Sequence, residues 1–213
     1  MSAPRRGTLG TRAPLIGLIG PIGCGKSTVA GWLAERGAEI VDADCVTRQL
    51  MSPGSSVVEA IFDRFGAEFR SRDGSLDRAA LGRLVFSDPD LLSELESIVH
   101  PAVAGALEGS IRAADSRVPA PVAIVLEAIK LVEAGHAPWC DEIWLLVCGR
   151  EAQLARLVGR GMAESDARQR VAAQVDSLAL WHSAATRTLR TDGPRDAVEL
   201  AVDAALREAL ARR

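Results

Sequence analysis

A glycine-rich segment near the N-terminus, GPIGCGKST from Gly20 to Thr28, has the residue types and the spacing that phosphate binding requires. It follows the apolar run PLIGLI and precedes the helical pattern VAGWLAERG. Glycine allows the backbone to approach an anion closely, so that a ring of backbone N–H groups surrounds the phosphate oxygens. The segment matches G-x-x-x-x-G-K-[ST] between a predicted strand and a predicted helix, which is the context that this phosphate loop needs.

The residues of this loop are predicted to have separate roles toward ATP. Lys26 is expected to reach the β- and γ-phosphates, and the hydroxyl of Ser27 is expected to hold Mg²⁺. The N-terminus of the following helix adds positive potential at the same place. Cys24 is interpreted as a small uncharged filler between two glycines, with a redox-sensitive thiol as the alternative. The predicted ATP-binding residues of the loop are Gly23, Cys24, Gly25, Lys26, Ser27 and Thr28.

A second polar segment, VDADCVTR from Val41 to Arg48, follows the second apolar run. Ligands of open α/β sheets bind at the carboxyl ends of the strands, where these carboxylates are expected. A carboxylate there can accept the proton of an attacking hydroxyl, and Asp44 is the candidate. Arg48 would share a helix face with Asp44 if a helix begins at Asp44, and it can hold an anionic part of the acceptor. A helix-capping carboxylate beside a solvated arginine is the alternative.

Composition restricts the class of protein further. The chain has 213 residues and a net charge of −3, which indicates one soluble domain without general affinity for nucleic acid or membrane. The four cysteines have no disulfide or metal spacing and predict free thiols in a reducing cytoplasm. Residues 1–13 are expected to form a disordered tail, not a signal peptide. There is no asparagine, so the N-K-x-D motif of GTPases is absent, and small-molecule kinases remain.

The arrangement of elements predicts an α/β fold with three layers. Strands are expected at 15–19 and 38–41, within VPAPVAIVLEA and DEIWLLVCG, and at 186–191. Their apolar runs lack alternation, which is typical of a parallel sheet buried on both faces. Helices are expected at 27–36, 151–160, 165–179 and 194–212. Residues 50–115 read as helical with breaks at SPGS, SRDGS, SDPD and HP, with helix starts at Asp77 and Asp88.

Several segments together resemble the dephospho-CoA kinase family in order and spacing. They are GPIGCGKSTVA, VDADCVTR, DGSLDRAALGRLVFSDP, LESIVHP and EAQLARLVGRGMAESDARQRVAAQ, and the match runs from about residue 15 to 193. The resemblance implies transfer of the ATP γ-phosphoryl group to the ribose 3′-hydroxyl of dephospho-CoA. No obligate protein partner is evident from the sequence. It also implies a phosphate-loop kinase fold with a parallel five-stranded sheet, a helical acceptor-binding insertion and a small lid.

On this resemblance, residues 14–213 form one kinase domain. Its core is expected at 14–48, 119–152 and 184–213, the acceptor-binding region at 49–118 and the lid region at 153–183. Asp44 is the implied general base and Arg48 an acceptor-site cation. Arg156 and Arg160 are the implied lid arginines, which would stabilise charge on the transferred phosphoryl group, with a solvated helix face as the alternative. His100 is implied as an acceptor contact or as a structural histidine at a helix end.

The chain also departs from the family pattern at two places. Ile129 and Lys130 follow the third strand where proline and leucine are expected, and Thr191 stands where an asparagine is expected near the adenine. Of the 25 Lys and Arg residues, only Lys26 and Lys130 are lysine. Because Lys26 needs a compact ammonium, we infer that Lys130 is also kept for its geometry and reaches a phosphate group. A surface lysine, or one paired with Glu127 or Glu133, is the alternative.

Two other functions stay open at this point. One is a nucleoside, nucleotide or other small-molecule kinase on the same core. The other is a nucleotide-binding regulatory module without turnover, against which Lys26, Ser27, Asp44 and the paired arginines argue.

Overall fold

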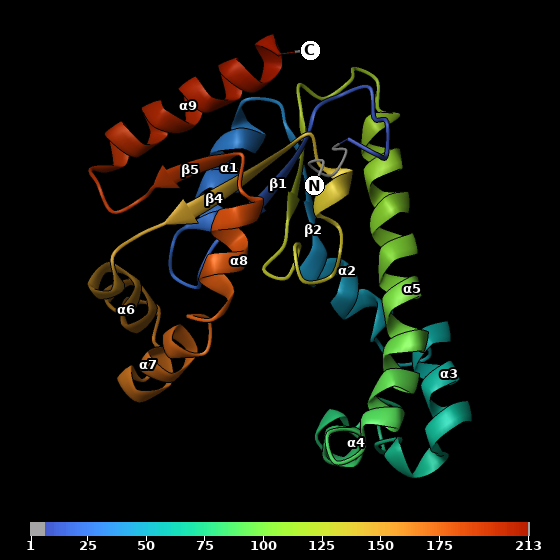
Figure 1. Ribbon diagram of the computed structural model, residues 1–213. Helices are drawn as coiled ribbons and strands as arrows, with labels where there is room; N and C mark the ends of the chain where they lie inside the picture. Colours follow the sequence, from blue (N-terminus) through green and yellow to red (C-terminus); the bar gives the residue numbers. More distant parts are fainter. Residues whose placement is uncertain (1–6, 213) are drawn as a thin grey trace. The chain divides into compact units, whose positions relative to one another are not determined.

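The computed structural model describes residues 7–212 and has a five-stranded sheet at its centre (Figure 1). The strand order is β2-β3-β1-β4-β5. β1 pairs in parallel with β3 and with β4, and β4 pairs in parallel with β5. The predicted parallel five-stranded sheet is therefore confirmed. The strands are β1 (Leu15–Ile19), β2 (Glu39–Asp42), β3 (Ile124–Glu127), β4 (Glu142–Val147) and β5 (Arg187–Arg190).

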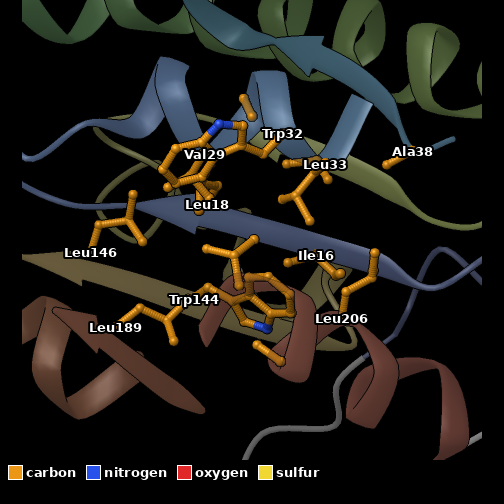
Figure 2. Packing of buried hydrophobic residues seen from close by; sticks show 14 of the residues in the cluster. Ile16, Leu18, Val29, Trp32, Leu33, Ala38, Trp144, Leu146, Leu189 and Leu206 are labelled. Atoms are coloured by element: carbon orange, nitrogen blue, oxygen red, sulfur yellow. The ribbon is translucent and has the colours of Figure 1, made fainter. Parts of the chain in front are cut away.

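The sheet is buried on both faces, as the unbroken apolar runs predict. Every residue of β1 is buried, so neither face of that strand meets solvent. One face carries the main apolar cluster, which helices α1 (Lys26–Glu35) and α9 (Arg195–Ala211) cover. Figure 2 shows Trp32 of α1, Trp144 of β4 and Leu206 of α9 in this cluster. Burial of such large side chains fixes α1, and with it the loop that precedes α1, against the sheet.

The chain divides into two compact units. The first contains the sheet and consists of the residues up to Val41 and those from Ile111 onward. The second, Asp42–Ser110, is helical and has its own apolar cluster, built around Val58, Ile61 and Leu81. It holds α2 (Ala43–Leu50), α3 (Ser56–Phe65), the short η1 (Ala67–Phe69), α4 (Arg78–Val85) and most of α5 (Pro89–Asp115).

The predicted helix break at His100-Pro101 is wrong. Helix α5 runs from Pro89 to Asp115 with Pro101 inside it. Proline in a helix interior removes one hydrogen bond and usually bends or ends the helix. Here Ile98 and Val99, just before the proline, pack against the apolar cluster of the helical unit, while Pro101 itself is exposed. Packing of the flanking turns therefore outweighs the local preference. The predicted helix starts at Asp77 and Asp88 are confirmed by capping hydrogen bonds.

The C-terminal half contains the remaining helices. The sequence-based prediction of one helix over 165–179 is wrong, because α7 (Glu164–Ala172) and α8 (Ser177–Ala184) are separated by a turn. The predicted helices at 151–160 and 194–212 correspond to α6 (Arg150–Gly159) and α9. A short η2 (Ala137–Trp139) precedes β4.

The predicted disordered tail is wrong for residues 7–13. The N–H of Gly7 donates to the carbonyl of Cys140 at 3.1 Å. The N–H of Arg12 and of Ala13 donate to the carboxylate of Asp115 at 3.0 and 2.9 Å. Residues 1–6 lie outside the described part of the chain. Within residues 7–212, no helix has the length and apolar character that crossing a bilayer would take.

Candidate active site

The phosphate loop connects the end of β1 to the start of α1, as the motif predicts. Gly25 caps the helix in a left-handed conformation, with φ 82° and ψ 26°. Gly23 also has a positive φ of 80°, and a Cβ there would lie 3.0 Å from the carbonyl oxygen of Gln153. A side chain at either position would strain the backbone, so the glycines permit the close turn that cups an anion.

The polar side chains of the loop lie in the first turn of α1. Lys26 begins the helix, and its ammonium donates a 2.7 Å hydrogen bond to the carbonyl of Gly20. The neighbouring Ser27 and Thr28 are exposed, so their hydroxyl groups are available at the helix N-terminus. This end carries the positive partial charge of α1, which favours an anionic ligand.

Two glutamine side chains support the loop from outside. Gln153 of α6 is buried, and its Nε2 donates to the carbonyl of Ile22 at 2.9 Å. The N–H of the same Ile22 donates to Oε1 of Gln174 at 2.7 Å. Neither glutamine is among the residues predicted for the site from the sequence. For Gln153, the sequence contains an indication of a place near the site, because this residue lies three positions before Arg156 and shares its helix face.

Arg156 and Thr191 join α6 and the segment after β5 to the loop. Nη1 of Arg156 donates to the carbonyl of Gly23 at 3.2 Å and to Oγ1 of Thr191 at 3.4 Å. Thr191 is buried, and its hydroxyl donates to the carbonyl of Cys24 at 2.9 Å. The residue that departs from the family pattern therefore positions both the loop and one of the predicted lid arginines.

A cavity of about 290 Å³ adjoins the loop within the sheet-containing unit. Arg156 and Arg160, the two predicted lid arginines, both line it, and Arg160 is exposed at the end of α6. On another wall, the guanidinium of Arg195 lies 5.5 Å from the centre of the Trp32 ring. The remaining lining residues are Gly25, Thr28, Val29, Thr191, Gly193 and Val198. A flat, partly apolar group bound here would meet guanidinium planes and an indole.

Cys24 lies in the phosphate loop and belongs to the apolar cluster against which Cys148 packs. Cys24 has no exposed surface, whereas Cys148, directly after β4, is half-buried. A hydrogen bond to Cys148, together with burial, raises the pKa of Cys24 well above its usual range. The hydrogen bond from Cys24 lowers the pKa of Cys148, and Arg156 and Thr191 act in the same direction. No sequence pattern pairs these two cysteines, because they are far apart in the chain.

The helical unit contains the predicted acceptor-site residues Asp44, Arg48 and His100. Helix α2 begins at Ala43, not at Asp44, and the carboxylate of Asp42 caps it by accepting from the N–H of Cys45 at 3.0 Å. The capping alternative therefore holds for Asp42 and leaves Asp44 in the first turn. Arg48 has its guanidinium 3.8 Å from the carboxylate of Asp42, and both side chains are largely exposed.

His100 lines a separate, mainly apolar cavity of about 340 Å³ inside the helical unit. Arg78 and Glu96 are its charged lining residues, and Thr47 on α2 also reaches it. The other residues around it are Met51, Leu76, Leu81, Gly82, Val85, Phe86, Leu92, Leu95 and Val99. Phe86 is 79% exposed, so an aromatic ring stands open beside this cavity. His100 therefore lies within α5 and not at its end. Its side chain is exposed and lines the cavity, so it does not belong to a packed core.

Lys130 lies in the segment that follows β3, three residues after the last residue of that strand. Its side chain is exposed, and its carbonyl accepts from the N–H of Ala134 at 2.9 Å. Glu133, one of the partners considered for an ion pair, instead accepts a 2.9 Å hydrogen bond from the indole of Trp181.

Comparison with known proteins gives one consistent family. The family model described as dephospho-CoA kinase matches residues 14–192. A dephospho-CoA kinase from Geobacter metallireducens is 44% identical over 162 residues, which is 76% of this chain and 80% of that protein.

Solved structures agree in fold. TT1252 from Thermus thermophilus superposes with a TM-score of 0.73 at 31% identity and covers 92% of this chain and 97% of its own. Dephospho-CoA kinase from Campylobacter jejuni has a TM-score of 0.65 at 19% identity, with 91% of this chain and 96% of that chain covered. The likeness at this lower identity concerns the phosphate-loop kinase fold alone. With its family model and its relative in agreement, the chain belongs to the dephospho-CoA kinase family.

Proposed function

We propose that this protein transfers the γ-phosphoryl group of ATP to the ribose 3′-hydroxyl of dephospho-CoA, giving coenzyme A and ADP. The observation that carries the proposal is the phosphate loop joined to the 290 Å³ cavity, in a chain of this family. A loop that binds phosphates and a neighbouring hollow for a planar base together match the shape of a nucleoside triphosphate.

For the nucleotide, we assign the cavity to adenine and the loop to the phosphates. The guanidinium groups of Arg156 and Arg195 and the indole of Trp32 offer faces on which adenine can stack. Backbone N–H groups of residues 23–28 surround the phosphates, and the ammonium of Lys26 exchanges the Gly20 carbonyl for phosphate oxygens.

Mg²⁺ fits the donor set at the start of α1. The exposed hydroxyl of Ser27 is a hard oxygen ligand, and Mg²⁺ is usually held by few protein oxygens together with substrate phosphates. Within residues 7–212, no group of three His, Cys, Asp or Glu side chains forms a metal site of its own. Bound there, Mg²⁺ would neutralise charge on the phosphates, and Ser27 is the residue that would hold it.

For the acceptor, we assign Asp44 as the general base that takes the proton of the ribose 3′-hydroxyl. β2 ends at Asp42, and Asp44 follows within the first turn of α2, so the base belongs to the carboxyl end of a strand of the sheet. Arg48 supplies positive charge for an anionic group of the acceptor. The apolar cavity beside His100 suits the long, weakly charged pantetheine arm of dephospho-CoA.

Arg160 is assigned to the transferring phosphoryl group. Phosphoryl transfer depends mainly on positioning and on neutralising charge at the equatorial oxygens. Arg160 is exposed at the end of α6, whereas Arg156 is held by hydrogen bonds to the Gly23 carbonyl and the Thr191 hydroxyl. Lys130, which we keep as a further phosphate-contacting residue, is also exposed.

The decisive experiment is a coupled assay with ATP, Mg²⁺ and dephospho-CoA, in which coenzyme A and ADP are both measured. Equal amounts of both products support the proposal. A parallel panel of nucleosides, nucleotides and other small alcohols tests whether another hydroxyl is the better acceptor. ATP binding without acceptor-dependent ADP release would instead indicate a regulatory module.

The four free thiols support the predicted location in a reducing cytoplasm.

A further inference from the structure

The floor of the phosphate loop contains a pair of cysteines that the phosphoryl-transfer chemistry does not use. Cys24 lies between Gly23 and Gly25, and Cys148 follows β4. The two residues are 124 positions apart in the sequence, and the strand order of the sheet brings them together. The sulfur of Cys148 lies 3.9 Å from the carbonyl oxygen of Gly23, the residue before Cys24, and Cys148 packs against the apolar cluster that contains Cys24. Both cysteines belong to the same compact unit.

The two thiols have different environments. Cys24 is fully buried within the main apolar cluster, and its pKa is raised, so it stays protonated. Cys148 lies at the edge of that cluster, and its pKa is lowered by the hydrogen bond from Cys24, with Arg156 and the Thr191 hydroxyl acting in the same direction. The thiolate is the reactive form of cysteine, so Cys148 is the nucleophile of the pair.

Cys148 is also reachable from outside the loop. A cavity of about 300 Å³, separate from the one assigned to adenine, has Cys148 in its wall. Arg150 and Gln174 add polar groups to that wall, beside Val171 and Leu178. A molecule as small as a peroxide fits this space readily, whereas Cys24 has no exposed surface and does not line the cavity.

We propose that Cys24 and Cys148 form a redox-modification site in which a peroxide links them as a disulfide. The thiolate of Cys148 attacks one peroxide oxygen, the O–O bond breaks, and Cys148 becomes a sulfenic acid while hydroxide or an alkoxide leaves. The sulfur of Cys24 then attacks the sulfur of Cys148, the S–O bond breaks, and water leaves. Two thiols are oxidised and one peroxide is reduced, so that electrons and atoms balance.

The disulfide would change the phosphate loop directly. An S–S bond is about 2.05 Å long, much shorter than a hydrogen-bonded contact between thiols, and it fixes the dihedral angles of both side chains. Cys24 lies between two glycines with positive φ, and its carbonyl is held by Thr191. Drawing its sulfur toward Cys148 therefore displaces the N–H groups that surround the phosphates. Bound ATP, which needs those N–H groups in place, opposes the reaction.

The test treats the full, reduced chain with hydrogen peroxide and traps the remaining thiols by alkylation. Trypsin alone leaves Cys140 and Cys148 on one peptide, so trypsin is combined with a protease that cleaves after glutamate. The expected product is residues 13–26 joined to residues 143–150, two mass units lighter than the two separate peptides. Dithiothreitol should separate them. ATP with Mg²⁺ should slow their formation.

Three variants make the outcome specific. Cys148→Ser should form no such product and should keep its ATP affinity after peroxide. Cys24→Ser should accumulate a sulfenic acid on Cys148 that dimedone traps. Cys45→Ser, which removes a thiol of the helical unit, should behave like the parent chain. For the parent chain, we expect ATP binding to weaken at least tenfold on oxidation and to recover on reduction.

Two results would overturn the inference. One is oxidation of Cys45 under conditions in which no peptide joins Cys24 to Cys148. The other is a protein with the Cys24–Cys148 disulfide that binds ATP as tightly as the reduced chain. Because peptide mass and ATP binding are measured without an acceptor, failure here is distinct from failure of the dephospho-CoA assay.

Discussion

Arg156 and Thr191 hold each other against the phosphate loop, and each also binds a different loop carbonyl. Nη1 of Arg156 donates to Oγ1 of Thr191 at 3.4 Å and to the carbonyl of Gly23 at 3.2 Å, while Thr191 donates to the carbonyl of Cys24 at 2.9 Å. Since these carbonyls belong to consecutive residues, their direction fixes the direction of the neighbouring N–H groups. The pair therefore links the geometry of the loop to the end of β5 and to α6.

Thr191→Val is expected to weaken ATP binding severalfold. The substitution keeps the shape of the side chain and removes its hydroxyl, which leaves the carbonyl of Cys24 without this buried donor. Loss of such a hydrogen bond costs about 1–3 kcal/mol. Isothermal titration with ATP and thermal unfolding measure the two effects. Thr188→Val, at an exposed position of the preceding strand β5, is the control and should change neither.

Arg160→Ala is expected to impair turnover, and Arg156→Ala is expected to impair ATP binding. Arg160 is exposed at the cavity rim, and its loss should lower kcat by about 10²-fold while ATP affinity in the resting enzyme is kept. Arg156 supports the loop, so its loss should weaken ATP binding itself. Steady-state kinetics combined with ATP titration separates these outcomes. An unchanged kcat with a raised KM for the acceptor would move Arg160 to substrate docking.

Asp44→Asn is expected to lower kcat by about 10²–10⁴-fold while ATP binding is retained, because the amide cannot accept the hydroxyl proton. Asp42→Asn is the matched control two residues earlier. Asp42 caps α2, and asparagine is also a good capping residue, so this variant should keep most of its turnover and its stability. If the effects of the two substitutions are reversed, Asp42 is the base.

Lys130→Arg is expected to lower kcat/KM at least about tenfold, equal to about 1.4 kcal/mol of transition-state stabilisation. A planar guanidinium cannot replace a compact ammonium at a phosphate group without changing the distances. The melting temperature should stay within a degree or two, since Lys130 is exposed. Full activity in this variant would show that Lys130 is an ordinary surface residue.

The sequence by itself determined the sheet and the phosphate loop. Unbroken apolar runs such as Leu15–Ile19 can be buried only in the middle of a sheet covered on both faces. The spacing of the glycines and Lys26 matches a phosphate loop, which lies between a strand and a helix. These are local signals, and they were sufficient for the fold and for the family resemblance.

The tertiary structure decided everything that depends on residues distant in sequence. Pro101 should end a helix locally, yet packing of the turns around it keeps α5 continuous. Residues 7–13 lack any apolar pattern, and contacts with residues distant in sequence, among them the carboxylate of Asp115 and the carbonyls of Pro138 and Cys140, hold them in place. Thr191 and Cys148 reach the phosphate loop because parallel pairing places β4 beside β1 and β5 beside β4, so that the ends of these strands lie at the same edge of the sheet. No pattern along the chain encodes that proximity, since it arises from strand order.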